Sequence, residues 1–468
     1  MRIKKTLKKL PFPIKQSAKY LYGLIPIRLR YGKVFWDTYN FLQESQWWSK
    51  EKLEEYQMQQ LSKLLHHAYE NVPYYRRVFD ERDLKPKDIQ EFDDLKKLPY
   101  LTKEIIKENL HDLIAKNYSK ARLQHTSTSG TTGGPLKFYL DKKVSMAREW
   151  AFMLIQWKRV GFQLGDKRVI LRGDIVHTVN KGKFWEYNSL NRTLILSSYH
   201  MTNEVLPKYI KKIREFRPSF IHAYPSAIAI LSKWMKENNI QPFQDIKALL
   251  CGSENIYSWQ RKLLENIFKC RVYSWYGHAE QAVLAGECEN SSHYHIFPEY
   301  GITELMGKDE KPITKDDELG EIVATGFNNY VMPFIRYKTR DIGTYCKQKC
   351  SCGRNYPLLK RIKGRFQEYF VSKSGNLVPF PGYGISLKVS NYIETFQYYQ
   401  AKNGYVILRI VKKNGYSIND SKKILKELTS RYGNDFDFKI EFFDNISRTK
   451  SGKYKYLIQK LPIEFGNS

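Results

Sequence analysis

Apolar positions near the start of the chain recur with the spacing of an amphipathic helix. Between residues 49 and 79 they include Leu53, Leu61 and Leu65, which would share one helical face. Ser49 is a suitable N-cap, and Val72-Pro73 predicts the end of the helix, because proline disfavours helical backbone in the residue before it. We therefore predict that residues 1–90 form a helical lead-in packed on the body of the protein.

Short apolar runs alternate with helix-like stretches through the middle of the chain. The pattern predicts helices over 145–161 and 206–216, and buried strands over 136–140, 168–171, 193–197, 220–224, 248–251 and 272–275. This alternation is typical of an α/β fold with mixed, largely parallel sheets flanked by helices. Ligands of such sheets bind at the carboxyl ends of the strands, where this chain has Tyr224, Gly252 and Tyr276.

The last third of the chain has a different pattern. Alternating strands are predicted over 320–325 and 334–339, followed by a basic connector over 360–365. A strand, a helix over 421–432 and a strand over 436–443 come next. We place a boundary near Gly364, which divides a large nucleotide- and acid-binding domain, 91–363, from a small mobile α+β domain, 364–468.

Composition narrows the class of protein. The 468 residues are 42% hydrophobic and 15% aromatic, as expected for a globular protein. No apolar run approaches the ~20 residues that a membrane span requires, and no signal peptide is recognised, so we expect a cytoplasmic protein. The six cysteines, several of them near histidines, fit a metal in a reducing compartment better than a disulfide scaffold.

The net charge of +30 allows several partners. Nucleic acid, an anionic membrane surface or an acidic substrate would each suit a basic protein. The lysines are scattered along the chain and no nucleic-acid-binding motif is present, so we interpret most of them as solvated surface and expect no nucleic-acid partner. Peripheral contact between the basic N-terminal segment and the inner face of the membrane stays open.

A loop rich in hydroxyls and glycines lies at 126–135 and reads TSTSGTTGGP. Glycine allows backbone N–H groups to approach an anion closely, and short hydroxyls donate to phosphate oxygens. The loop lacks the Gly-Lys-Ser/Thr ending of a P-loop. A flexible Ser/Thr/Gly linker is the alternative interpretation.

Six motifs follow one another along the chain: TSGTTGGP (128–135), YGHAE (276–280), GEIVAT (320–325), PFIRYKTRD (333–341), RIKGR (361–365) and RTKSGK (448–453). In this order they resemble the adenylate-forming superfamily of acyl- and aryl-CoA ligases. The resemblance is to the phenylacetate–CoA ligase-like branch, particularly to members associated with capsular polysaccharide biosynthesis. It implies ATP-dependent activation of a small carboxylic acid as an acyl-adenylate. The acyl group would then pass to coenzyme A, or to another thiol or amine acceptor.

The resemblance also implies a role for each motif. The β- and γ-phosphates of ATP would be held by Thr128, Ser129, Gly130, Thr131, Thr132 and Gly133. The adenine would lie between Tyr276 and the segment Gly252, Ser253 and Glu254. Asp341 would accept the ribose hydroxyls, with Arg365 nearby, and Glu280 would coordinate Mg²⁺.

Lys453 is the catalytic residue that the resemblance implies. A lysine on a small mobile domain can reach the α-phosphate when that domain closes, and its compact charge suits developing negative charge. The alternative is a solvated lysine of a basic C-terminal tail.

Zinc is a second metal that the resemblance implies, with Cys288, His295, Cys350 and Cys352 as the favoured ligands. His293 and Cys346 lie in the same region, and unligated thiols are the alternative.

Two positions depart from the pattern of the superfamily: Ala279 replaces a usual Ser or Thr, and Gln367 lies at the expected hinge. They leave open a second hypothesis, a catalytically inactive basic scaffold that is stabilised by zinc and binds an anionic polymer or a membrane.

Overall fold

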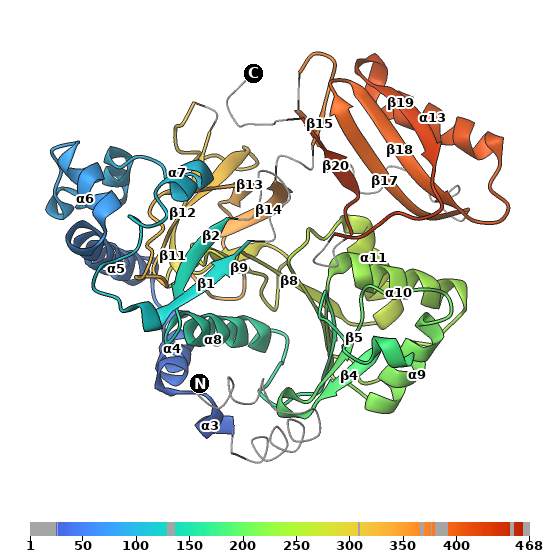
Figure 1. Ribbon diagram of the computed structural model, residues 1–468, viewed down its shortest axis with the longest axis horizontal. Coiled ribbons are helices and arrows are strands. Elements are labelled where there is room, and N and C mark those ends of the chain that lie inside the picture. Colours follow the sequence, from blue (N-terminus) through green and yellow to red (C-terminus); the bar gives the residue numbers. More distant parts are fainter. Residues whose placement is uncertain are drawn as a thin grey trace.

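A computed structural model of the chain describes residues 25, 27–128, 136–307, 309–365, 369–375, 377–379, 392–449 and 454–461 (Figure 1). The predicted lead-in, residues 1–90, contains helices α3 (Ile27–Arg30), α4 (Lys33–Ser45), α5 (Lys50–Asn71) and α6 (Pro73–Asp80), and α7 (Lys103–Glu108) follows it. The Ser49 side chain accepts a hydrogen bond from the Lys52 amide at 3.3 Å, so the predicted N-cap of α5 is confirmed. Helix α5 ends before Val72, as predicted, but α6 begins at once, because a proline at the first helical position has no N–H to satisfy.

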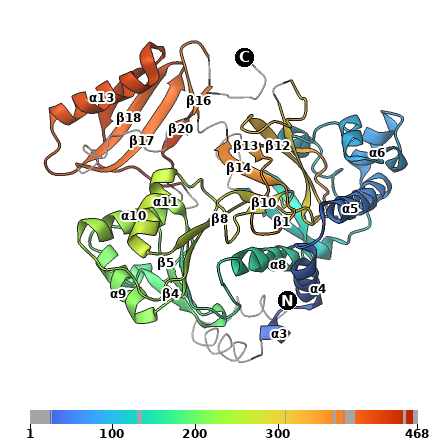
Figure 2. The ribbon, with the colours of Figure 1, turned by 180° about the vertical axis from the view of Figure 1, so that it is seen from behind.

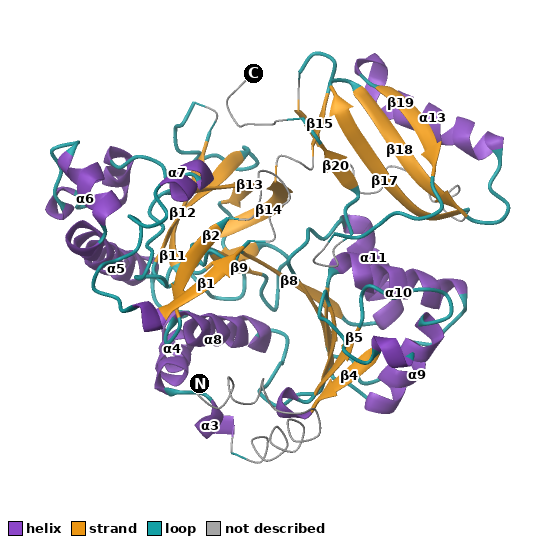
Figure 3. Ribbon diagram, viewed as in Figure 1, coloured by secondary structure: helices purple, strands orange, loops and turns teal. Residues whose placement is uncertain are grey.

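Twelve strands form one sheet in the order β11-β12-β13-β14-β10-β9-β8-β7-β6-β3-β5-β4 (Figure 3). Its first six strands in the chain are β3 (Arg168–Leu171), β4 (Trp185–Asn188), β5 (Thr193–Leu196), β6 (Phe220–Ala223), β7 (Ala248–Cys251) and β8 (Arg271–Gly277). Its other six are β9 (Leu284–Gly286), β10 (Tyr294–Ile296), β11 (Gly301–Met306), β12 (Gly320–Gly326), β13 (Tyr337–Cys346) and β14 (Leu358–Arg365).

The parallel part of the sheet is smaller than the sequence suggests. Strands β8, β7, β6, β3 and β5 are parallel to one another. Every pair along the order β8-β9-β10-β14-β13-β12-β11 is antiparallel, and so is the pair of β4 with β5. The strands after β8 follow one another without crossover helices, which parallel pairing requires. The mixed α/β class is confirmed, and the expectation of a largely parallel sheet holds for five strands only.

Helices cover both faces of the parallel strands. Apolar side chains of α8 (Ser145–Lys158) pack with Phe220, Leu250 and Tyr273. The alternate residues of the same strands, such as Ile221 and Leu249, pack with the helices of the other face. Those helices are α9 (Leu206–Phe216), α10 (Pro225–Glu237) and α11 (Ser258–Phe268).

The predicted strand over 334–339 is wrong at its start. Strand β13 begins at Tyr337, because Arg336 has a left-handed backbone with φ of +49° that interrupts the extended conformation. The buried Arg336 side chain donates to Glu304 at 3.1 Å and to the Leu98 carbonyl at 2.8 Å, which holds this turn against the lead-in.

The C-terminal part has its own sheet, ordered β19-β18-β17-β20, and its described residues include the helix α13 (Ile418–Tyr432). The strands are β17 (Ile393–Lys402), β18 (Tyr405–Lys412), β19 (Asp437–Phe442) and β20 (Leu457–Gln459), with a separate pair β15 (Tyr369–Val371) and β16 (Leu377–Pro379). It lies against α10 and α11 (Figure 2), where Lys413 pairs with Glu237 at 2.7 Å and Tyr456 packs on Tyr257. Among the described residues, no helix is both long and apolar enough to span a membrane.

Candidate active site

The carboxyl ends of four parallel strands bring the predicted nucleotide residues to one edge of the sheet. Leu171, Ala223, Cys251 and Ser274 are neighbours in register across β3, β6, β7 and β8. The residues that follow them therefore lie side by side, and they include Ser253 after β7 and Tyr276 near the end of β8. Ligands of α/β sheets bind at this kind of edge.

Tyr276 and Asp341 meet at this edge, although 65 positions separate them in the chain. The Tyr276 hydroxyl donates to Asp341 Oδ2 at 2.8 Å, and the Asp341 amide donates to Thr339 Oγ1 at 3.1 Å. Burial and the Asp341 carboxylate raise the pKa of Tyr276 well above its usual value, so the hydroxyl keeps its proton and donates.

Glu280 lies just beyond β8 and is 4% exposed. Tyr337 donates its hydroxyl to Glu280 Oε1 at 3.0 Å, and His278 Nδ1 lies 3.3 Å from Oε2. Burial alone would raise the pKa of Glu280, but the charge and hydrogen bonding of His278 outweigh it and lower this pKa to about 2. A buried carboxylate that stays ionised is suited to a cation.

The segment 252–254 fills the space between two neighbouring strands. A Cβ on Gly252 would come within 2.6 Å of the Trp275 ring, so only glycine allows this close packing. Ser253 has a left-handed backbone with φ of +68°, and its hydroxyl accepts a hydrogen bond from Arg172 Nη2 at 2.8 Å. Glu254 accepts hydrogen bonds from the amide and the hydroxyl of Ser226, at 2.9 and 3.0 Å, and so fixes the segment to the start of α10.

Three side chains at this edge were missed in the sequence. Arg172 bonds both Ser253 and His222, while Tyr337 and His278 hold Glu280. Burial and the adjacent Arg172 keep the pKa of His222 well below its usual value, so the imidazole is neutral. Arg172 directly follows the predicted strand 168–171. Because ligands bind at the carboxyl ends of such strands, a polar residue at this position could have indicated a site residue.

Part of the predicted site lies outside the described residues: Ser129, Gly130, Thr131, Thr132, Gly133, Gln367, Lys453 and the side chain of Arg365. The flanks of the loop are described, as strands β1 (Leu123–Ser127) and β2 (Lys137–Asp141). Thr128 closes the base of the loop, because its hydroxyl accepts from the Leu136 amide at 3.0 Å. The backbone of Arg365 is paired in register with Asp341, across β14 and β13.

A separate cluster brings together Cys288, His295, Cys350 and Cys352, whose potential ligand atoms lie within 4.8 Å of one another. Cys288 and Cys350 have their sulfurs 3.5 Å apart, and Cys352 Sγ lies 3.3 Å from His295 Nε2. His295 Nδ1 faces the His293 carbonyl at 3.2 Å, which favours a proton on Nδ1 and leaves Nε2 free to bind a metal. This donor set fits tetrahedral zinc. Among the described residues, His293 and Cys346 are not part of the cluster.

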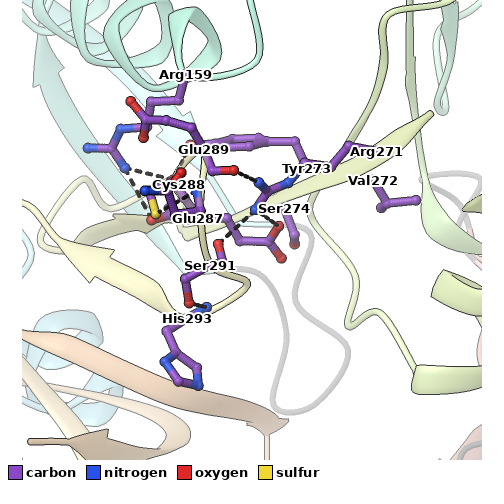
Figure 4. A network of polar contacts seen from close by, with 12 residues as sticks. Arg159, Arg271, Val272, Tyr273, Ser274, Glu287, Cys288, Glu289, Ser291 and His293 are labelled. Atoms are coloured by element: carbon purple, nitrogen blue, oxygen red, sulfur yellow. Dashed lines mark hydrogen bonds and ion pairs between the residues drawn. The ribbon is translucent and has the colours of Figure 1, made fainter. Parts of the chain in front are cut away.

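Polar contacts hold the connection that carries Cys288 (Figure 4). Arg159 and Tyr273 donate to the carbonyl of Glu287, at 2.8 and 2.9 Å, and Arg271 donates to the carbonyl of Ser291 at 2.8 Å. The connection between β13 and β14 carries Cys350 and Cys352. Arg354 ties this connection to Glu289 through two hydrogen bonds of 2.7 and 2.9 Å. Both loops of the cluster are therefore fixed independently of a metal.

Comparison with known proteins identifies the family. A family model described as the CapK C-terminal domain matches residues 371–460. Protein CapK of Staphylococcus aureus is 27% identical over 447 residues, which cover 94% of this chain and 95% of that protein. Phenylacetate-coenzyme A ligase of Escherichia coli (strain K12) is 28% identical over 339 residues, or 71% of this chain and 75% of that enzyme. These similarities support an adenylate-forming, phenylacetate–CoA ligase-like family for this chain, with Protein CapK among its relatives.

Solved structures share the fold of this ligase. A crystal structure of 2-hydroxyisobutyryl-CoA ligase in the postadenylation state, in complex with 2-HIB-AMP, superposes with a TM-score of 0.69 at 16% identity. It covers 89% of this chain and 93% of that one. The same enzyme in the thioesterification state, with 2-HIB-AMP and CoA, superposes with a TM-score of 0.57. The predicted class of an adenylate-forming enzyme is confirmed, and the hypothesis of an inactive scaffold gains no support.

Proposed function

We propose that this ligase uses ATP and Mg²⁺ to activate a small carboxylic acid as an acyl-adenylate, and then transfers the acyl group to coenzyme A or another thiol or amine. The observation that carries the proposal is the Tyr276–Asp341 pair at 2.8 Å, at the same sheet edge as the buried, ionised Glu280. Asp341 would accept the ribose hydroxyls, while Tyr276 and the segment 252–254 would enclose the adenine.

Glu280 would hold the magnesium ion. Mg²⁺ prefers one or two carboxylates together with phosphate oxygens, and Glu280 remains charged although it is 4% exposed. When bound, Mg²⁺ would neutralise part of the phosphate charge, and Tyr337 and His278 would orient the carboxylate that holds it. The hydroxyls and backbone of 128–133 would contact the β- and γ-phosphates, with Thr128 anchoring the loop.

The acid would lie beyond Gly252, next to a group of aromatic rings. Trp157 and Trp275 have ring centroids 5.6 Å apart, and the neutral His222 lies 5.0 Å from Trp157. Apolar and aromatic walls with few polar groups are typical of small-molecule sites. Arg172, bonded to Ser253 and His222, would be the cation nearest to the acid.

Lys453 would act from the C-terminal domain in the adenylation step. Its positive charge would stabilise the charge that develops at the α-phosphate and the attacking carboxylate. The second step needs that space for the acceptor, so a rotation near 364–368 would follow. One ligase of this fold has been solved in a postadenylation and in a thioesterification state, and this chain superposes on them with TM-scores of 0.69 and 0.57.

We further propose that the cluster of Cys288, His295, Cys350 and Cys352 binds one structural zinc ion. Four protein ligands close a tetrahedral site and leave no open position for catalysis. A role in capsular polysaccharide assembly is suggested by the likeness to Protein CapK over 94% of the chain, and would make a sugar amine or a carrier thiol a candidate acceptor.

Acid-dependent exchange of pyrophosphate into ATP tests the function. We expect one acid of a panel of aryl and short acyl acids to support exchange, and Lys453→Ala to lower the rate by about two orders of magnitude or more while ATP still binds. The control is Lys460→Ala, a lysine of the same tail. Exchange that Lys453→Ala leaves unchanged would contradict the role of Lys453, and ATP binding that Asp341→Ala leaves unchanged would contradict the nucleotide site.

A further inference from the structure

A cavity of about 560 Å³ lies at the amino ends of the parallel strands. It is opposite the carboxyl ends of these strands, where we propose that the nucleotide binds and which we call the nucleotide edge. It is lined by Arg168, the first residue of β3, by the loop before β5, and by residues Arg30 and Tyr31 of the lead-in. Arg172 lies four positions after Arg168, a distance of about 13 Å along a strand. Trp157 is 1% exposed and lies between the two arginines, so the cavity is separate from the proposed acid site.

Arg168 is a buried cation that lines this cavity and forms no ion pair with a described residue. Its side chain is surrounded by the rings of Trp150, Trp157 and Phe162, at 5.4, 5.2 and 5.6 Å, and the residue is 9% exposed. Its Nε and Nη1 atoms are buried and form no hydrogen bond. No ion pair involving Arg168 occurs among the described residues. Burial lowers the pKa of the guanidinium to about 10, which still leaves it protonated at neutral pH.

An unpaired buried cation is expensive, because desolvation disfavours its charge. Ring contacts recover part of that cost, but they leave the N–H groups unsatisfied. The first 24 residues of the chain contain no aspartate or glutamate, so they cannot supply a carboxylate. Asp166, the one acidic residue in the lining, already accepts the Gln163 amide at 2.8 Å. The charge of Asp174 also acts on Arg168, but no hydrogen bond or ion pair joins the two among the described residues, so the N–H groups of Arg168 are left for an anion from outside the chain.

Other lining groups add charge and flat surfaces. Arg192 is exposed and donates to the Gly165 carbonyl at 3.1 Å, while Arg30 donates to the Leu190 carbonyl at 2.8 Å. The lining of the cavity therefore contains three arginines and one carboxylate. Trp150, Phe162 and the partly exposed Tyr187 provide aromatic walls. Guanidinium groups bind phosphate and carboxylate oxygens in pairs, and aromatic walls favour a ring.

We propose that this cavity binds a small organic anion, a phosphate monoester or a carboxylate carried on a ring, with Arg168 as the anchor of the anionic group. Its size lies within the range of about 300–1,000 Å³ that is usual for small-molecule sites. The site is distinct from the nucleotide edge and does not depend on the proposed function.

Thermal-shift and calorimetric titrations test the site. The probes are phenyl phosphate and benzoate, with inorganic phosphate to test the anionic group alone and benzyl alcohol as the neutral counterpart. Saturating AMP occupies the nucleotide edge, and physiological salt suppresses non-specific binding to a chain of net charge +30. We expect one of the two ring anions to raise Tm and bind measurably, and benzyl alcohol to do neither.

Arg168→Met separates a ligand anchor from a structural arginine. Loss of a charge-assisted hydrogen bond should weaken the probe by roughly ten- to a hundredfold. Without ligand, Tm should stay the same or rise, because an apolar side chain of similar length replaces an unpaired buried charge. A purely structural role for Arg168 would instead lower Tm in the absence of ligand and leave the folded variant with the parental affinity for the probe, and that combined result would overturn the proposal.

Arg192→Gln tests the same cavity at an exposed position that folding tolerates, and we expect several-fold weaker binding. Arg82→Gln, an exposed arginine of the lead-in, is the matched control and should bind as the parent does. No binding of either ring anion to the parent protein overturns the proposal. Parental affinity in both Arg168→Met and Arg192→Gln does so as well, and if Arg168→Met does not fold, Arg192→Gln decides alone.

Discussion

Single side chains at the nucleotide edge are held by partners that come from distant parts of the chain. Tyr276 holds Asp341, His278 and Tyr337 hold Glu280, and Ser226 holds Glu254. Each carboxylate is therefore oriented before a ligand arrives. Preorganised groups lose less free energy when they bind, so their removal should affect nucleotide binding more than folding.

Asp341→Ala and Tyr276→Phe form a graded pair. Asp341→Ala removes the acceptor proposed for the ribose hydroxyls and should weaken ATP binding by about 2–4 kcal/mol. Tyr276→Phe removes only the hydroxyl that orients Asp341, at 2.8 Å, and should cost about 1 kcal/mol. Calorimetric titration with ATP measures both. Equal losses for the two variants would mean that Asp341 does not touch the ribose.

Gly252→Ala tests the close packing between segment 252–254 and β8. The added Cβ would lie 2.6 Å from the Trp275 ring, so either the ring or the segment has to move. We expect a loss of roughly 1–3 kcal/mol in the free energy of unfolding and a higher KM for the acid. Gly32→Ala is the matched control, because Gly32 has a φ of −72° and the added Cβ meets nothing within 4 Å. A parental KM in folded Gly252→Ala would place the acid elsewhere.

Paired elements create the cysteine–histidine cluster. The connection between β9 and β10 supplies Cys288, β10 supplies His295, and the connection between β13 and β14 supplies the other two cysteines. Strands β10 and β14 pair directly, so a metal here would link the two connections at the edge of a continuous sheet. Loss of the metal should lower the stability of the protein before it lowers the catalytic activity.

Removal of zinc tests whether the cysteine–histidine cluster binds a structural metal. We expect one equivalent of zinc per chain by elemental analysis of protein purified without chelator. Chelation, or Cys350→Ser, should lower Tm by several degrees, since loss of a bound structural metal is loss of folding free energy. Cys270→Ser, outside the cluster, is the matched control. Zinc well below one equivalent, with an unchanged Tm after chelation, would contradict a metal site.

At the scale of the whole molecule, described residues of the C-terminal domain contact α10 and the start of α11 through polar and aromatic side chains. Lys413 pairs with Glu237 at 2.7 Å, Lys233 donates to the Ile393 carbonyl at 2.9 Å, and Tyr456 packs near Tyr257. The charged pair is partly exposed and should contribute less than about 1 kcal/mol. Such an interface is compatible with two domain orientations of similar free energy.

Lys413→Glu should shift the balance between these orientations. It places two carboxylates together, so the orientation that is stabilised by the Lys413–Glu237 pair becomes less populated. We expect the ratio of pyrophosphate exchange to overall acyl transfer to change by roughly two- to fivefold. The double variant Lys413→Glu with Glu237→Lys restores opposite charges and should recover the parental ratio. A ratio unchanged in Lys413→Glu would show that this contact does not bias the rotation.

Local sequence patterns determined most of the elements of this protein and their order. Helices such as 206–216 and strands such as 168–171 and 248–251 were predicted at their observed positions, because apolar periodicity is a property of neighbouring residues. The motifs indicated the superfamily, and the four cysteine and histidine residues that were favoured as zinc ligands lie close together in the structure, while zinc binding stays a prediction.

Only the tertiary structure decided which side chains meet. Arg172 reaches Ser253 across 81 positions and Tyr276 reaches Asp341 across 65, and such contacts depend on the order and register of strands that no local pattern encodes. The start of β13 was missed because Arg336 turns to reach Glu304, a long-range ion pair that outweighs local strand propensity. Arg168 was one basic residue among 78 in the sequence. Its burial among three rings without an anion is a consequence of packing between α8 and β3, and that packing made it a candidate binding residue.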